Sequence, residues 1–108
     1  MDWTTTRTDE ALIGHPTGRI DEGSWEELNT ALDSAIAEAA DAGLAFLIDL
    51  AGVPYMSSRG LRVLTLARRE AMARSVPIAL ARPNDRMREI LAISRYDKIF
   101  EIRPAIAS

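Results

Sequence analysis

Three segments of the chain repeat hydrophobic residues every three or four positions, which is the spacing of an amphipathic helix. The first segment begins after Ser24 and ends at Gly43, a residue type that commonly closes helices. Ser24 is followed three positions later by Glu27, and this pair predicts a capping box at the start of the helix. The inward face of this helix is predicted to hold Trp25, Leu28, Leu32, Ala35, Ile36 and Ala39.

Two further helices are predicted in the second half of the chain. One runs from about Ser58 to Arg74, and the other follows Pro83 with Asn84 as its N-cap. With about 100° of rotation per residue, each helix gathers small or apolar residues on one face. The inward positions are Gly60, Leu64, Ala67 and Ala71 in the former and Met87, Ile90 and Leu91 in the latter.

The segments between the helices have the composition of strands. Strands are predicted at residues 2–8, 11–16, 44–50, 76–81 and 98–102. The first two are joined by a polar corner at residues 9–10, which favours a hairpin at the edge of the sheet. The third is a continuous apolar run, typical of a strand buried on both faces. The order β-β-α-β-α-β-α-β predicts a single α/β domain over residues 1–108, with a mixed, mostly parallel sheet covered by helices.

Composition excludes several classes of site. The 108 residues include no cysteine and one histidine, His15, so a disulfide scaffold and a clustered imidazole metal site are excluded. His15 is expected to be structural or solvent-facing. We find no glycine-rich phosphate loop and no nucleophile motif, and we therefore expect neither an enzyme nor a bound cofactor. No apolar run approaches the roughly 20 residues that span a bilayer, so we expect a cytoplasmic protein without membrane insertion.

Charge is segregated along the chain although the net charge is only -3. Residues 1–54 carry 11 acidic and 2 basic side chains, whereas residues 55–108 carry 5 acidic and 11 basic ones. The arginines of the second half are scattered through apolar helical patterns without interleaved aromatic residues. This pattern argues against nucleic-acid binding and predicts ion pairs between the two halves.

Four short motifs follow one another along nearly the whole chain. They are Gly18-Arg19-Ile20-Asp21 before the first helix, Leu47-Ile48-Asp49-Leu50 in the central strand, Ser57-Ser58-Arg59-Gly60-Leu61-Arg62-Val63-Leu64 at the second helix and Asp97-Lys98-Ile99-Phe100 near the end. In this order and spacing they resemble the STAS domain, the fold of bacterial anti-sigma factor antagonists and of the cytoplasmic domain of sulfate transporters. The resemblance implies the STAS fold.

The resemblance also implies a phosphorylation site. In antagonists of this family, the anti-sigma factor is itself a kinase and phosphorylates the serine two places before the glycine of the third motif. That residue is Ser58 here, and Ser57 is the less favoured acceptor. The motif departs from the family where Ser57 replaces a common aspartate and Arg59 a second serine or an alanine. The alternative interpretation is that both serines only cap the helix, a role worth about 1 kcal/mol.

The second helix also presents a candidate surface for a protein partner. Its outward face is predicted to expose Leu66 among Arg59, Arg62 and Arg69, with Ala73 further along. An apolar anchor ringed by guanidinium groups suits protein binding, because arginine tolerates desolvation and makes bidentate contacts to carboxylates. Arg59 and Arg62 also place positive charge near the position of a phosphate on Ser58. The family places Asp21 beside the Ser58 loop, within reach of the same partner; otherwise this carboxylate only favours a helix start.

Two functions follow as expectations. The first is a partner switch, in which the protein captures an anti-sigma factor serine kinase, frees a sigma factor and is reset by a serine phosphatase. The second is a constitutive STAS subunit of a larger assembly, such as a lipid-transport ATPase complex or a stress-signalling particle, with the same helix as a fixed docking surface. Small-molecule binding at the Asp21 and Ser58 loops is a weaker third interpretation. The protein itself is expected to be a monomer or a weak dimer.

Overall fold

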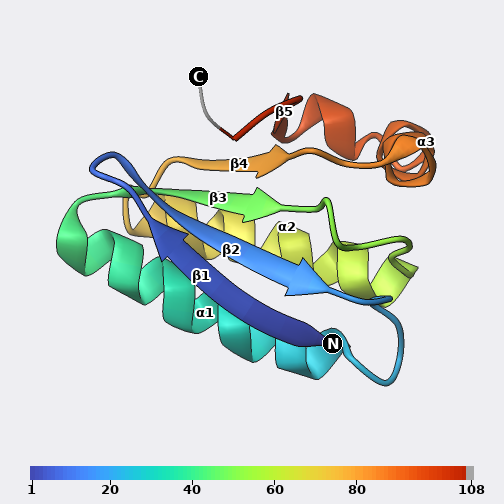
Figure 1. Cartoon of the computed structure of the whole chain (residues 1–108), viewed down its shortest axis with the longest axis horizontal. Helices are drawn as coiled ribbons and strands as arrows, with labels where there is room; N and C mark the ends of the chain where they lie inside the picture. The colour runs from blue at the N-terminus through green and yellow to red at the C-terminus, as the bar shows by residue number, and fades with distance from the viewer. Residues whose placement is uncertain (107–108) are drawn as a thin grey trace.

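The strands of the sheet lie side by side in the order in which they occur along the chain, β1-β2-β3-β4-β5 (Figure 1). The computed structural model describes residues 1–106. The strands are β1 (Asp2–Arg7), β2 (Ala11–Thr17), β3 (Ala45–Asp49), β4 (Ile78–Ala81) and β5 (Glu101–Arg103). The helices are α1 (Trp25–Ala42), α2 (Ser58–Ala73), α3 (Asp85–Ile93) and a 3-10 turn, η1 (Tyr96–Lys98). The predicted element order is confirmed.

The sheet is mixed, as predicted. β1 and β2 form an antiparallel hairpin whose pairing is unbroken from Asp2 opposite Thr17 to Arg7 opposite Leu12. β2, β3, β4 and β5 are all parallel to one another. Parallel neighbours need crossover connections, and the helices supply them.

Two helices cover one face of the sheet. α1 and α2 lie against this face in Figure 1, and the predicted inward positions of both helices are buried, except that Trp25 is half-buried. The core between the helices and the sheet includes Phe46, Ile48 and Leu80. A smaller cluster lies on the other face, where Ile106 packs against its buried members. Those members are Ile13, Leu47, Ala79 and Ala81.

The last strand differs from its prediction at residues 98–102. The backbone N–H groups of Ile99 and Phe100 both donate to the carbonyl of Tyr96, at 3.0 and 2.9 Å. These donors are therefore used locally, and the ladder to β4 starts only at Glu101. β4 is also shorter than predicted, because it begins at Ile78, after Pro77, which has no N–H to donate.

Candidate functional site

Two loops meet at the end of the sheet where β2 and β3 finish. The β2–α1 loop (residues 18–24) and the β3–α2 loop (residues 50–57) are joined by three backbone hydrogen bonds. Gly18 N–H donates to Gly52 at 2.9 Å, and Ile20 N–H donates to Tyr55 at 3.0 Å. Ser57 N–H donates to Ile20 at 2.8 Å. The first turn of α2 is thus held beside the loop that carries Asp21, as the resemblance implied.

Gly60 sets how closely α2 approaches these loops. A Cβ atom at this position would lie 2.5 Å from Met56 Cγ and 2.7 Å from Ile20 Cγ2. Both neighbours are buried, so they have little room to move. The spacing Ser58-x-Gly60 therefore has a packing reason, because only glycine lets the first turn sit on the bridge between the loops.

The two serines at the start of α2 have different roles. Ser57 is the N-cap, with extended backbone, and its hydroxyl accepts a hydrogen bond from Gly60 N–H at 3.3 Å. Ser58 is the first helical residue, and its side chain is exposed. The interpretation that both serines cap the helix is therefore wrong for Ser58. Its hydroxyl faces solvent at the positive end of the helix dipole, where a phosphate is tolerated.

Asp21 is half-buried and turned into its own loop. Its Oδ1 accepts hydrogen bonds from Gly23 N–H at 3.0 Å and from Ser24 Oγ at 3.3 Å. Ser24 is buried and its hydroxyl also donates to the Arg19 carbonyl at 2.9 Å. Its oxygen accepts from Asp21 N–H at 3.0 Å and makes no capping bond to α1. The predicted capping box with Glu27 is wrong, because the serine is used to shape the loop.

The residues of the predicted partner surface are exposed along α2. Leu66 is 40% exposed, and Arg62 and Arg69 are exposed with it. Arg59 turns toward the start of α1, where its guanidinium lies 3.7 Å from Glu22 and 5.0 Å from the centre of the Trp25 ring. A hollow of about 460 Å³ lies between the helices there. It is lined by Trp25, Arg59, Arg62, Val63 and Leu66.

A second aromatic contact lies on the other side of the β3–α2 loop, and the sequence did not indicate it. The guanidinium of Arg19 lies 4.5 Å from the centre of the Tyr55 ring, and that of Arg86 lies 5.1 Å from it. These residues come from the β2–α1 loop, the β3–α2 loop and the first turn of α3. Tyr55 thus gathers two positive charges beside the loop that leads into α2.

A polar network on the face of the sheet away from α1 and α2 was also missed. His15 Nδ1 lies 2.8 Å from Asp49 Oδ2, and His15 Nε2 lies 2.8 Å from Thr6 Oγ1. Arg82 donates to both oxygens of Asp49, from Nε at 3.0 Å and from Nη2 at 2.6 Å. The network joins β1, β2 and β3 to the residue after β4. His15 therefore has a structural position, which agrees with its predicted role.

The Asp49 carboxylate is ionised in this network. Burial alone raises its pKa, but the hydrogen bonds from Arg82, His15 and Ala51 N–H, with the charge of Arg82, outweigh burial and hold the pKa below its ordinary value. The same hydrogen bond and charge from Asp49 raise the pKa of Arg82. Arg82–Asp49 and Arg59–Glu22 are the ion pairs between the two halves of the chain that the charge segregation predicted.

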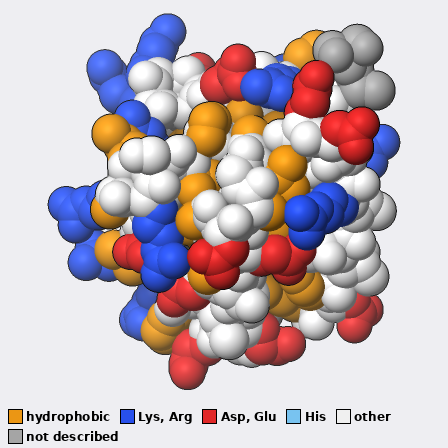
Figure 2. All heavy atoms as spheres, turned by 90° about the vertical axis from the view of Figure 1, so that its left-hand side faces the viewer, with side chains coloured by type: hydrophobic (Ala, Val, Ile, Leu, Met, Phe, Trp, Pro, Cys, Tyr) orange, Lys and Arg blue, Asp and Glu red, His pale blue; other side chains and the backbone are white. Residues whose placement is uncertain are grey.

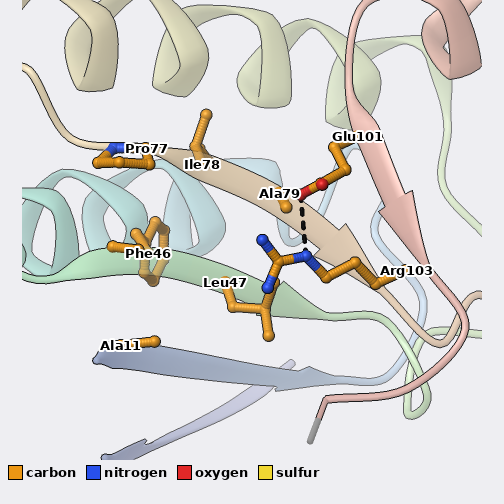
Figure 3. A pocket seen from close by; sticks show the side chains of 9 residues that line it. Ala11, Phe46, Leu47, Pro77, Ile78, Ala79, Glu101 and Arg103 are labelled. Atoms are coloured by element: carbon orange, nitrogen blue, oxygen red, sulfur yellow. Dashed lines mark hydrogen bonds and ion pairs between the residues drawn. The ribbon is translucent and has the colours of Figure 1, made fainter. Parts of the chain in front are cut away.

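A smaller hollow lies away from the Ser58 loop. A hollow of about 50 Å³ lies over the sheet where β3 and β4 begin, beside the Arg103–Glu101 ion pair (Figure 3). Its floor is mostly apolar, with Phe46, Leu47 and Ala79 in view. The end of the molecule on this side mixes acidic, basic and hydrophobic side chains (Figure 2). Within residues 1–106 no cluster of three His, Asp or Glu side chains is placed to hold a metal, and no helix is long and apolar enough to cross a membrane.

The structure thus brings most of the predicted site residues to one end of the sheet. Asp21, Ser57, Ser58 and Arg59 lie at the joined loops and the first turn of α2. The other three, Arg62, Leu66 and Arg69, continue along the same helix. With about 1.5 Å of rise per residue, Arg69 lies roughly 16 Å along the helix from Ser58. The site is therefore an extended surface along α2, called the Ser58 ridge below, and it borders the hollow beside Trp25.

Comparison with known proteins places the whole chain in one family of domains. Residues 2–108 match the model of the STAS domain. A STAS-domain containing protein of Pseudomonas aeruginosa is 31% identical over 85 residues, which are 79% of this chain and 80% of that protein.

Solved structures with the same fold include proteins described as anti-sigma factor antagonists. One from Mycobacterium paratuberculosis has a TM-score of 0.84 at 20% identity, covering 97% of this chain and 86% of that one. The antagonist SpoIIAA in its unphosphorylated form has a TM-score of 0.75 at 17% identity, covering 98% and 90%. Phosphorylated SpoIIAA, a Bacillus cell fate determinant, has a TM-score of 0.68 at 19% identity, covering 98% and 93%.

Proposed function

This chain belongs to the STAS domain family, and we propose that it is an anti-sigma factor antagonist that captures an anti-sigma factor with serine kinase activity and so frees a sigma factor. Phosphorylation of Ser58 by that kinase ends the capture, and a serine phosphatase restores it. One observation carries the proposal: Ser57 caps α2 and leaves the Ser58 hydroxyl exposed. The role places the protein in the cytoplasm, where sigma factors act. The shared fold with proteins described as antagonists supports it.

The switch requires no movement of α2. A phosphate on Ser58 would sit at the N-terminus of the helix, where the dipole favours negative charge, so the free protein keeps its structure. In a complex, the same dianion would have to lose its water inside the interface. A penalty of about 3 kcal/mol corresponds to a roughly hundredfold loss of affinity. A phosphate that the folded domain accepts can therefore still displace a partner.

The surface beside Ser58 suits a partner that presents an apolar side chain flanked by carboxylates. Leu66 supplies an exposed apolar anchor, and Arg62 and Arg69 supply positive charge around it. The hollow beside Trp25 can receive an apolar side chain of the partner. We expect the anti-sigma factor to contact this ridge through carboxylates that flank an apolar side chain.

A constitutive docking subunit is the second candidate function, and the length of the ridge favours it. Leu66 lies eight residues after Ser58, so the two are roughly 12 Å apart along the helix. A partner that uses only the far part of the ridge would not contact a phosphate on Ser58. The side chain of Arg59, which could approach that phosphate, pairs with Glu22 and stacks on Trp25.

Capture from a lysate of the source organism separates the two functions. The baits are the unphosphorylated wild type, Ser58→Ala and Ser58→Glu, and retained proteins are identified by mass spectrometry. Ser34→Glu is the matched control, because it adds the same charge at an exposed position of α1. The switch predicts that wild type, Ser58→Ala and Ser34→Glu all retain a serine-kinase anti-sigma factor and that Ser58→Glu loses it.

Two other results would change the assignment. Equal retention of a transporter or scaffold subunit by all four baits would exclude the switch and favour the constitutive subunit. Loss of the anti-sigma factor by Ser34→Glu as well would show that added negative charge alone weakens binding. A kinase assay with the captured protein then tests the acceptor directly, since Ser58→Ala should abolish phosphate incorporation and Ser34→Glu should retain it.

A further inference from the structure

The two edges of the sheet are built differently. Within residues 1–106, β1 forms one edge and pairs with β2 alone, over six consecutive residues. All of its residues except Trp3 are exposed. β5 forms the other edge with three residues, of which Glu101 and Arg103 are charged. In Figure 1, β1 is the outermost strand on its side of the sheet. One edge is thus three residues long, and the other is six residues long, with its charged residues, Asp2 and Arg7, at its two ends.

Natural proteins usually protect a long edge strand against pairing with another chain. The common devices are proline, lysine, a bulge or an inward-pointing charge. β1 contains no proline or lysine, and its register with β2 runs without a bulge. Its centre is the run Thr4-Thr5-Thr6, a β-branched sequence that favours extended structure. This edge is therefore available for strand pairing.

The hairpin turn fixes which backbone groups of β1 face outward. Thr8 N–H donates to the Ala11 carbonyl at 2.9 Å, so these two residues form a hydrogen-bonded pair. Hydrogen-bonded and non-bonded pairs alternate along antiparallel strands. Thr6 and Thr4 therefore bond to β2. The N–H and C=O groups of the alternate residues point away from the sheet, and these residues are Trp3, Thr5 and Arg7.

We propose that β1 pairs antiparallel with β1 of a second copy of this chain, about a two-fold axis that passes between the two Thr5 residues. In an antiparallel pair, residues with outward-facing groups must stand opposite one another. Trp3, Thr5 and Arg7 are spaced evenly about Thr5. The register centred on Thr5 gives all three a partner within the strand, and two-fold symmetry forms six backbone hydrogen bonds.

Side-chain chemistry supports the same register. Trp3 of each copy stands opposite Arg7 of the other, so no like charges face each other in this register. Within each copy, the packing of Trp3 over Gly14 and the Arg7–Glu38 ion pair at 3.9 Å can stay as they are. A shift that centres the pair on Arg7 would place two like charges opposite each other and would run Thr5 against Asp9 of the hairpin turn. A shift toward Trp3 leaves Arg7 beyond the end of the partner strand.

Pairing of one strand buries little surface, so the dimer is weak. Specific interfaces below about 1,200 Å² are typical of transient complexes. We expect the dimer to form at protein concentrations of roughly tens of micromolar and not at nanomolar concentrations. It joins two five-stranded sheets into one continuous sheet. The pairing uses backbone groups of β1 and none of the residues around Ser58, so this inference does not rest on the proposed function.

Sedimentation equilibrium of protein with an untagged N-terminus tests the dimer, over roughly 5 to 500 µM. Thr5→Pro removes an outward N–H and leaves the ladder to β2 intact, because the edge is where a strand tolerates proline. The wild type should rise from one chain mass toward two, and Thr5→Pro should stay at one with unchanged circular dichroism. Thr5→Val, the matched control, should behave as wild type. A wild type that stays monomeric, or Thr5→Pro that dimerises equally, would overturn the proposal.

A crosslinking variant gives a second readout that does not depend on proline. The chain has no cysteine, so a single Thr5→Cys substitution introduces its only thiol. Hydrogen-bonded antiparallel pairs hold Cα atoms about 5.5 Å apart, which is within disulfide range. Mild oxidation should convert Thr5→Cys to covalent dimer at least tenfold faster than Thr30→Cys, an exposed control on α1. Equal rates would contradict the two-fold axis at Thr5.

Discussion

Arg82 holds the carboxylate of Asp49 with two hydrogen bonds, from Nε at 3.0 Å and from Nη2 at 2.6 Å. The arginine adopts a left-handed backbone, with φ of 52°, directly after β4. Asp49 is the last residue of β3 and is buried, and it also accepts from Ala51 N–H at 3.1 Å. One carboxylate therefore fixes the ends of two neighbouring strands and the start of the β3–α2 loop.

Asp49→Asn should destabilise the domain by about 2 kcal/mol, because hydrogen bonds to charged groups are worth about 1.5 to 3 kcal/mol each and a neutral amide replaces only some of them. Urea unfolding measures the loss. The control is Glu70→Gln, which breaks the exposed Glu70–Arg74 pair and should cost less than about 0.5 kcal/mol. Equal losses for the two variants would show that the Asp49 network is not a stabilising element.

Stability should fall in acid because the pKa of Asp49 is lowered in the folded state. The unfolded chain takes up the proton first, at its ordinary pKa of about 3.9, so the contribution of Asp49 is complete above that value. It is lost as the pH falls through the lower folded-state pKa. Urea unfolding between pH 2 and 7 should show a larger acid loss for wild type than for Asp49→Asn. Parallel pH curves would contradict the lowered pKa.

Gly60→Ala should destabilise the domain by about 2 kcal/mol. The new Cβ would clash with Met56 and Ile20, and this overpacking outweighs the better helix propensity of alanine, which is worth about 1 kcal/mol. Gly23→Ala is the control, because its Cβ would come no closer than 3.5 Å to Asp21 Oδ1. Thermal unfolding compares the two. A neutral Gly60→Ala would show that the first turn of α2 is free to shift.

Substitution of Ser57 and of Ser58 should change the free energy of unfolding by different amounts. Ser57→Ala removes the cap of α2 and should cost about 1 kcal/mol. Ser58→Ala removes an exposed hydroxyl and should stay within about 0.5 kcal/mol of wild type. Denaturant unfolding of both variants under one condition gives the comparison. The reverse order would assign the cap to Ser58 and would weaken its case as an acceptor.

Leu66→Ala should weaken capture of the anti-sigma factor at least tenfold while the free energy of unfolding changes by less than about 1 kcal/mol, because Leu66 is 40% exposed. Met72→Ala is the matched control, since Met72 is 60% exposed near the end of the same helix. Titration of purified partner measures affinity. Equal affinities for the two variants would remove Leu66 from the partner surface.

Much of the fold follows from patterns that are local in the sequence. The inward face of α1 and that of α2 repeat at helical spacing, and the Asn84 cap bonds to Met87 N–H at 2.8 Å as predicted. The capping box at Ser24 failed for a non-local reason, because the serine satisfies the Arg19 carbonyl in a folded loop. β5 begins at Glu101 and not at residue 98 because the backbone N–H groups of Ile99 and Phe100 donate to the Tyr96 carbonyl and are not free to pair with β4.

The site was predictable in part. The joined loops place Asp21 beside the start of α2 as expected, but the direction of each side chain depends on neighbours that are distant in sequence. Arg59 turns to Trp25, which no spacing could show. The His15–Asp49 contact has a weak sequence signal, because each residue lies at or near the carboxyl end of adjacent parallel strands.

The hydrogen bonds between the two site loops join backbone groups alone, from Gly18, Ile20, Gly52, Tyr55 and Ser57. The packing under these hydrogen bonds constrains Gly60 and the buried side chains of Ile20 and Met56. Exposed side chains around these two loops can therefore differ between duplicated genes without breaking the hydrogen bonds that join the loops. A genome that carries several such domains can assign each one a separate partner by surface substitutions, and crosstalk between the resulting pathways is then limited by those substitutions rather than by the fold.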